Sequence, residues 1–328
     1  MAKANSLIER FPEVSKLELI GQLVPPPEFL AARFENYKPD DEFRSQAEAL
    51  TAAQSFARGS KAKLFKKAEV APGIYLDGGF GVGKTHLLAS IWHAFPGKKV
   101  YGSFLEYTSL VGYLGFKQSV EELSKYGLVC IDEFELDDPG DTMIMSRLLK
   151  ELELRDVKFA ATSNTPPNAL GSGRFAASDF KREIQGLGSR FKILSVDGED
   201  YRHRNISGES PNLTVELLSE WLNETDGAFS DDFEDVLKHL AKLHPTKYRA
   251  LVFGLPALGI RGVRLLDDQV DALRLVALID RLYEFQVPLK SSGAVPLTGV
   301  FTDAMIAGAY RKKYLRTISR IGALTSLT

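Results

Sequence analysis

Gly78-Gly79-Phe80-Gly81-Val82-Gly83-Lys84-Thr85 is the stretch that decides the fold, because it fits the phosphate-binding pattern G-x-x-x-x-G-K-[ST]. The residues before it, 73–77, are typical of a short buried strand, and apolar residues recur at helical spacing over 87–95. In a strand, glycine loop and helix, backbone N–H groups and the helix N-terminus face phosphate oxygens. We therefore predict that residues 78–85, together with His86, bind a nucleotide. Lys84 would reach its β- and γ-phosphates, and the Thr85 hydroxyl would ligate Mg²⁺.

A second motif supplies the acidic residues that a nucleotide hydrolase needs. The apolar run Leu128-Val129-Cys130-Ile131 is expected of a central parallel strand, and it ends in Asp132-Glu133. Ligands of open α/β sheets lie at the carboxyl ends of the strands. There we expect Asp132 to hold Mg²⁺, directly or through a water, and Glu133 to act as general base on the attacking water. A GTPase is not expected, because no Asn-Lys-x-Asp tetrad occurs in the sequence.

A third element, residues 158–164, is typical of another buried strand with polar residues at its end. Asn164 is expected beside the acidic strand end, where it would orient the lytic water or touch the γ-phosphate. Alternatively, Asn164 only starts the turn that leads into Thr165-Pro166-Pro167.

The composition is that of an intracellular globular enzyme. Of 328 residues 44% are hydrophobic, and the net charge of −2 argues against a protein whose main task is to grip a phosphate backbone. Cys130 is the single cysteine, so a disulfide within these 328 residues is excluded. We see no signal peptide, and the longest apolar stretch, 251–260, is broken by glycine and proline and is too short for a membrane helix. We therefore expect a cytoplasmic protein.

The order of strands and helices predicts a doubly wound parallel α/β sheet of the P-loop NTPase type. We divide the chain into an N-terminal helical lead-in (1–66), the nucleotide core (67–204) and a mixed α/β C-terminal extension (205–328). The elements expected besides those above are helices within 40–58, 143–154, 229–243 and 270–282, and strands at 100–101, 191–196, 212–215 and 249–256.

Beyond these general motifs, the sequence resembles one family. Gly83–Leu88, Asp132-Glu133-Phe134 and Thr162-Ser163-Asn164 look like the AAA+ class of ATPases. Three further segments resemble signatures of the ZapE family of bacterial cell-division ATPases, which has mitochondrial relatives implicated in protein quality control; these segments are Val196–Arg202, Leu278–Tyr283 and Arg316–Ile321. The resemblance covers about residues 34–321. It implies an ATP- and Mg²⁺-dependent AAA+ ATPase that forms homo-oligomers with nucleotide and acts on a division protein such as FtsZ.

The sequence departs from that family at one place. An arginine that commonly follows a Leu-Tyr-x-x-Gly-Leu-Gln-like stretch in the family is missing from its position at 170–177. An ATPase of this class usually needs an arginine from a neighbouring subunit to neutralise charge on the transferring phosphoryl group. Arg174, Arg182 and Arg190 lie nearby and are the candidates.

Three function classes fit these motifs. The first is a Mg²⁺-dependent ATPase that remodels or destabilises a protein assembly. In bacteria this ATPase would be recruited to the division site, and the sequence leaves peripheral contact with the membrane as an alternative. The second is a helicase-loader or replication-initiator ATPase. Such a protein generally needs a basic DNA-reading element, but only the tail around Arg311-Lys312-Lys313 is locally basic here, so sequence-specific nucleic-acid binding is not expected. The third is a nucleotide-gated scaffold that hydrolyses little, against which the Asp132-Glu133 pair argues.

Overall fold

The computed structural model describes residues 5–58, 73–79, 81–134, 139–164, 186, 189–199, 212–308 and 310–327. The chain forms two compact units. The P-loop unit spans 16–203, and the C-terminal unit combines 1–15 with 204–328. We predicted domain boundaries at residues 66 and 204. That the segments between them fold independently remains a prediction.

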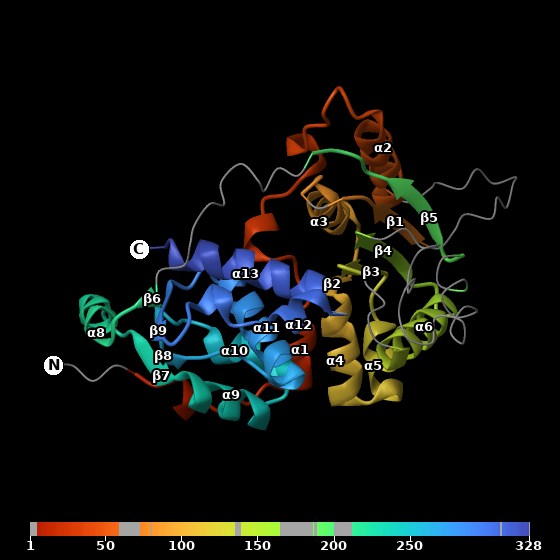
Figure 1. Cartoon of the computed structure of the whole chain (residues 1–328). Coiled ribbons are helices and arrows are strands. Elements are labelled where there is room, and N and C mark those ends of the chain that lie inside the picture. The colour runs from red at the N-terminus through yellow and green to blue at the C-terminus, as the bar shows by residue number, and fades with distance from the viewer. Residues whose placement is uncertain are drawn as a thin grey trace, which may run out of the picture. The chain divides into compact units, whose positions relative to one another are not determined.

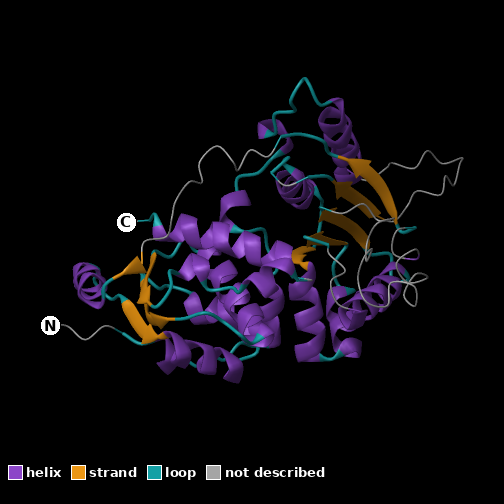
Figure 2. Cartoon of the chain, in the orientation of Figure 1, coloured by secondary structure: helices purple, strands orange, loops and turns teal. Residues whose placement is uncertain are grey.

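The P-loop unit is built on a five-stranded parallel sheet with the strand order β2-β3-β4-β1-β5 (Figures 1 and 2). Its strands are β1 (Gly73–Asp77), β2 (Lys99–Ser103), β3 (Leu128–Asp132), β4 (Lys158–Ser163) and β5 (Phe191–Ser195). Its helices are α1 (Lys16–Gly21), α2 (Arg44–Arg58), α3 (Lys84–Ala94), α4 (Phe104–Leu114), α5 (Phe116–Leu123) and α6 (Pro139–Glu153), with short 3₁₀ turns at Pro27–Phe29 and Phe34–Asn36. The predicted doubly wound parallel α/β class is confirmed.

Helices flank both faces of this sheet, which explains why the inner strands β1 and β3 are buried and apolar over most of their length. Figure 1 shows α2 and α3 on one side and α4, α5 and α6 on the other. Ile74 and Leu76 of β1 belong to the apolar core beneath α2 and α3. Tyr75 between them points to the opposite face, where its ring packs edge-on against Phe134 and Phe191. A strand buried on both sides has no polar face, so continuous apolar runs are required.

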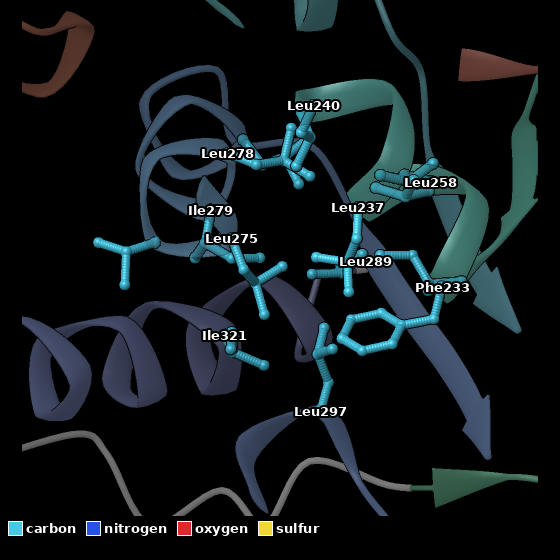
Figure 3. Close-up of a cluster of buried hydrophobic side chains, with 14 of the residues drawn as sticks. Phe233, Leu237, Leu240, Leu258, Leu275, Leu278, Ile279, Leu289, Leu297 and Ile321 are labelled. Atoms are coloured by element: carbon cyan, nitrogen blue, oxygen red, sulfur yellow. The ribbon is translucent and has the colours of Figure 1, made fainter. Parts of the chain in front are cut away.

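The C-terminal unit contains a second parallel sheet, with the order β6-β9-β8-β7. Its strands are β6 (Asn212–Leu213), β7 (Phe229–Asp232), β8 (Leu258–Val263) and β9 (Leu289–Gly293). Its helices are α8 (Val215–Glu224), α9 (Phe233–Lys242), α10 (Tyr248–Val252), α11 (Gln269–Glu284), α12 (Asp303–Ala307) and α13 (Arg311–Thr325), with 3₁₀ turns at Leu7–Glu9, Pro245–Lys247 and Leu297–Gly299. Figure 3 shows the core in which side chains of α9, α11 and α13 meet those of β8 and β9.

In this unit one sequence prediction was wrong in element type, and a second was wrong over its first four residues. The predicted strand at 249–256 is the short helix α10, and the strand begins two residues later as β8. The Tyr248 hydroxyl donates to the Leu240 carbonyl (2.9 Å) and fixes α10 against α9. A short apolar run does not distinguish a buried helix from a buried strand. The helix predicted at 229–243 starts only at Phe233, because residues 229–232 pair with β8 as β7.

The first residues of the chain pack into the C-terminal unit. Asn5 forms a parallel bridge with Phe229, and the Leu7 N–H donates to the Asp231 carboxylate (2.6 Å). Leu7 itself is fully buried in the core of this unit. The Arg10 guanidinium donates to the Phe253 carbonyl (3.0 Å). Residues 5–10 are therefore an integral part of the core of a unit whose strands all follow residue 211.

An ion-pair cluster joins α11 to α13. The Asp280 carboxylate accepts hydrogen bonds from Arg316 (3.2 Å) and from Arg320. Burial would raise the pKa of Asp280, but the positive charges of Arg320, Arg316 and Arg281 outweigh burial and hold that pKa below its usual range. A carboxylate whose folded pKa is depressed stabilises the protein above its unfolded pKa, and the stabilisation is lost as pH falls through the folded value.

Replacing Asp280 with asparagine is expected to lower the unfolding free energy of the C-terminal unit by about 3 kcal/mol, because two arginines lose their buried partner. The gap between wild type and variant should close as pH falls below about 4, where the unfolded carboxylate is protonated. Trp221 fluorescence during urea unfolding, in a Trp92→Phe background, measures this unit alone, since the chain has two tryptophans. Asp267→Asn, at a side chain that is 90% exposed, is the control. An equal effect of both variants would contradict the argument.

Within the described residues, no helix has the length and apolar character needed to cross a membrane.

Candidate functional site

The glycine loop between β1 and α3 has the backbone geometry of a phosphate cradle. Gly81 and Gly83 have φ values of 68° and 90°, in the left-handed region that favours glycine. The helix α3 starts directly afterwards at Lys84, and its first hydrogen bond runs from the Leu87 N–H to the Gly83 carbonyl (3.1 Å). The N–H groups of the first turn of α3 therefore have no partner within the helix and can face an anion. Phe80 lies outside the described residues.

Two of the glycines also allow neighbouring segments to pack closely on the loop. A Cβ on Gly78 would stand 2.1 Å from the Val196 carbonyl oxygen, just after β5. A Cβ on Gly83 would stand 2.8 Å from the Tyr37 ring of the lead-in. The loop is thus enclosed by β5 on one side and the lead-in on the other. Sequence reasoning assigned these glycines to phosphate binding only, and the packing adds a second requirement.

Lys84 lies inside the loop and is only 7% exposed. Its ammonium donates to the carbonyls of Gly78 (2.9 Å) and Gly79, and to Oδ1 of Asn164 (3.0 Å). The structure thereby brings Asn164, at the end of β4, to the lysine of the glycine loop. This proximity is what the prediction of neighbouring strand ends requires.

His86 and Val82 have surroundings of their own. The His86 ring nitrogen Nε2 lies 3.0 Å from the Arg33 carbonyl, and its ring lies 5.5 Å from that of Tyr37. The His86 side chain therefore contacts the lead-in. Val82 is buried, and a Cβ on Gly198 would stand 3.3 Å from it. A role of Val82 in nucleotide binding would therefore rest on its backbone.

Asp132 ends β3 directly beside the start of α3. Its Oδ1 lies 3.3 Å from the Thr85 hydroxyl, and its Oδ2 accepts a 2.8 Å hydrogen bond from the Tyr101 hydroxyl. The Thr162 hydroxyl also donates to Oδ1. Burial and then the neighbouring charge of Glu133 raise the pKa of Asp132, whereas the hydrogen bonds from Thr162 and Tyr101 oppose that rise.

The donor set fits a hard cation such as Mg²⁺. Thr85 and Asp132 offer a hydroxyl and a carboxylate oxygen, which are the ligand types that Mg²⁺ prefers, usually with one or two carboxylates and several waters. In the described part of the chain no group of three or more His, Cys, Asp or Glu side chains could hold a metal by itself. A site of this kind suits a metal that arrives with a nucleotide, because phosphates complete its coordination.

Glu133 sits in an unusual backbone conformation. Its φ is +53°, and its N–H donates to the Asp132 carboxylate and to the Thr162 hydroxyl, both at 3.1 Å. The next N–H, of Phe134, donates to the Thr162 carbonyl (2.7 Å), and the fully buried Phe134 ring packs edge-on against Phe104 at 5.3 Å. Non-glycine residues in left-handed conformations cost free energy and cluster at functional sites. Directly after this turn, Phe134 is still hydrogen-bonded to β4 and packed in the core.

Of the three candidate arginines, Arg190 has an ion-pair partner within the chain. Arg190, directly before β5, forms an ion pair with Glu153 at the end of α6, and its side chain is 18% exposed. A residue with an intramolecular partner must break that pair before it reaches another subunit. Arg174 and Arg182 lie outside the described residues.

Sequence reasoning missed Tyr101 and the contacts of Thr162. Each belongs to a strand next to β3, at a position where its side chain reaches Asp132. The local sequence around each residue only indicates a strand, and the pairing of strands decides which residues meet. Both residues can be found only once the strand order β2-β3-β4 is known, and the structure supplies that order.

The comparisons with known proteins point to one family. The sequence profile of the AFG1-like ATPases matches residues 14–215 and 210–328. The cell division protein ZapE of Escherichia coli K12 is 24% identical over 305 aligned residues, covering 77% of this chain and 78% of that protein. Lactation elevated protein 1 homolog B of Danio rerio is 34% identical over 92 residues, covering 28% of this chain and 18% of that protein. The predicted resemblance to the ZapE family is confirmed.

Solved structures with a similar arrangement were also found. The crystal structure of DnaI has a TM-score of 0.42 at 19% identity and covers 53% of this chain and 93% of its own. The AMPPCP-bound DnaA from Aquifex aeolicus has a TM-score of 0.41 at 14% identity and covers 94% of this chain and 100% of its own.

Proposed function

Since the chain belongs to the family of AFG1-like ATPases, we propose that it is a Mg²⁺-dependent ATP hydrolase that remodels or destabilises a protein assembly. One observation carries the enzymatic part of this proposal. The Lys84 ammonium, the Thr85 hydroxyl and the Asp132 carboxylate meet at the carboxyl edge of one parallel sheet, with Glu133 next in the chain and Asn164 directly after the adjacent strand β4.

Each side chain at this edge has a distinct task in hydrolysis. Lys84 would exchange the carbonyls of Gly78 and Gly79 for phosphate oxygens, so its positive charge is already in place when ATP arrives. Glu133 would accept the proton of the attacking water as general base. Asn164, 3.0 Å from the Lys84 ammonium, would orient that water with its amide. When bound between Thr85 and Asp132, Mg²⁺ would supply neutralisation of charge on the phosphate oxygens.

The protein target is proposed on the likeness to ZapE, which is a cell division protein. We propose that the chain acts in the cytoplasm on a division protein such as FtsZ, as a nucleotide-dependent homo-oligomer. The net charge of −2 supports a protein target over nucleic acid, because binding to a phosphate backbone relies on clustered lysine and arginine.

Replacing Lys84 with alanine is expected to weaken ATP binding by about 100-fold or more, because hydrogen bonds from a charged donor contribute about 1.5–3 kcal/mol each and two phosphate groups lose theirs. Titration with a fluorescent ATP analogue measures this change.

Lys99→Ala is the matched control for that titration. Lys99 also donates to two backbone carbonyls, those of His93 (3.0 Å) and Phe95 (2.9 Å), but at the opposite end of α3. Its loss removes the same charge from the far end of α3, although Lys99 itself belongs to β2, and is expected to change ATP affinity by no more than about twofold. An Lys84→Ala variant that binds ATP as tightly as the Lys99→Ala variant would refute the proposed phosphate site.

A further inference from the structure

Tyr101 stands on the strand next to Asp132 and reaches its carboxylate. In the parallel pairing of β2 and β3, Tyr101 is opposite Cys130, and Ser103 is opposite Asp132. Side chains two residues apart on a strand share one face of the sheet. Tyr101 and Asp132 therefore lie on the same face, and the long phenol bridges the diagonal between them with a 2.8 Å hydrogen bond to Oδ2.

Together, the contacts of Asp132 hold both of its carboxylate oxygens. Oδ1 accepts hydrogen bonds from the Thr162 hydroxyl and the Glu133 N–H, and it lies 3.3 Å from the Thr85 hydroxyl. On Oδ2 the hydrogen bond given by the structure comes from Tyr101. With a donor on each oxygen, the carboxylate cannot turn about its Cβ–Cγ bond without breaking a contact.

The phenol that makes this contact is itself immobilised. Tyr101 is 2% exposed and belongs to the apolar core beneath α3. Its N–H donates to the Leu23 carbonyl at 2.8 Å, so the outer edge of β2 is also paired at this residue. A ring held by packing and by its backbone presents its hydroxyl at one fixed place, which is what a positioning group requires.

We propose that Tyr101 is a positioning residue of the Mg²⁺ site, whose hydroxyl fixes the Asp132 carboxylate so that Oδ1 faces the Thr85 hydroxyl. This inference rests on the proposed function, since it concerns the same site. Partners that orient a metal-ligating group without touching the metal typically change metal affinity by about 10- to 100-fold when they are removed. Tyr101 acts on the metal through Asp132, whereas nucleotide without metal is held by the loop and Lys84.

The test measures metal binding directly, with Mn²⁺ as the probe. Binding of Mn²⁺ to the protein saturated with a non-hydrolysable ATP analogue is followed by the loss of the free Mn²⁺ signal in electron paramagnetic resonance. Tyr101→Phe is expected to weaken Mn²⁺ binding by about 10- to 100-fold. Binding of the analogue in EDTA should stay within about twofold of wild type.

Tyr107→Phe is the matched control. Tyr107 is also fully buried, and its hydroxyl donates to the backbone carbonyl of Cys130 at 3.0 Å, two residues along β3 from the Tyr101 contact with Asp132. Its loss removes a buried phenolic hydroxyl beside β3 but leaves the Asp132 carboxylate held. Mn²⁺ binding by this variant should stay within about twofold of wild type.

Two unnatural residues at position 101 distinguish loss of the hydrogen bond from a failure of the variant to fold. 4-Fluorophenylalanine and 4-aminophenylalanine both fill the para position, and only the second keeps a hydrogen-bond donor there. Mn²⁺ binding should be weak with the fluoro group and restored with the amino group. If Tyr101→Phe weakens Mn²⁺ binding no more than Tyr107→Phe, or if both para substituents behave alike, the inference is overturned. Failure of the wild type to bind the analogue would instead overturn the proposed function.

Discussion

Replacing Glu133 with glutamine is expected to lower ATP turnover by about 10²- to 10⁴-fold, the usual contribution of a general base, while ATP remains bound. Glutamine keeps the length of the side chain and leaves the N–H contacts to Asp132 and Thr162 possible, so the turn at φ +53° should persist. Only the ability to accept a proton from water is lost. Phosphate release measures turnover, and titration with a fluorescent ATP analogue measures affinity.

Glu106→Gln is the control for this variant. Glu106 lies in the first turn of α4, just beyond the end of β2, where its carboxylate accepts from the Ser103 N–H at 2.7 Å and caps the helix. The substitution removes the same charge next to the strand that neighbours β3. Turnover should stay within about threefold of wild type, because a cap contributes to helix stability and not to water activation. Wild-type hydrolysis by Glu133→Gln would place water activation elsewhere.

The same variant offers a way to the protein target. An ATPase that keeps ATP but cannot hydrolyse it is expected to hold its partner, so crosslinking with Glu133→Gln should enrich a division protein, and FtsZ is the first to test. Lys84→Ala, which should not bind ATP, is the negative control and should not enrich the partner. A salt-dependent DNA-binding assay on the same preparation tests the helicase-loader alternative, because binding to phosphate backbone weakens steeply with salt.

Hydrolysis is expected to depend on an arginine from a neighbouring subunit, worth about 10³- to 10⁵-fold in rate. Specific activity should therefore rise with protein concentration. Mixing a variant of Arg174, Arg182 or Arg190 with Lys84→Ala should restore part of the activity, because each subunit supplies what the other lacks. Arg190 has an additional requirement, since its ion pair with Glu153 must open first.

A Glu153→Gln variant separates Arg190 from the other two candidates. It removes the ion-pair partner of Arg190. If Arg190 is the arginine that reaches the neighbouring active site, Glu153→Gln should lower the protein concentration at which activity is half-maximal. Turnover that is independent of concentration, with no restoration by any of the three mixtures, would indicate a self-contained monomeric site and contradict the proposed oligomer.

The sequence predicted the parts of the site that lie within a single segment. The glycine loop, the strand end at Asp132 and the strand end at Asn164 each carry a local pattern, and the carboxyl edge of a parallel sheet brings them together. Tyr101 could not be predicted in this way, because its role depends on the strand pairing of β2 with β3.

In the second parallel sheet the strand predicted at 212–215 is found as β6, but β8 and β9 escaped prediction for a different reason. The strand β8 contains Gly259 and Gly262, and β9 contains Ser291, Ser292 and Gly293, so neither shows the apolar run typical of a buried strand. A Cβ on Gly259 would stand 3.0 Å from Leu222 of α8, and one on Gly293 would stand 2.2 Å from the Val263 backbone nitrogen. These strands are defined by close packing against neighbours that are distant in sequence, and local propensity contributes little.

The place of residues 5–10 sets an order of events while the protein is being made. This segment leaves the ribosome long before the groups it binds, from Phe229 to Phe253, which lie 224 to 243 residues further along the chain. At roughly 5–20 residues per second, it waits about 12–50 s for them. The P-loop unit can complete its sheet during that interval, while residues 5–10 are still without the residues that they pack against. The C-terminal unit therefore closes around a segment synthesised long before the rest of that unit, and a chain that stalls before Phe253 would present this unpaired segment, with the apolar Leu7, to chaperones.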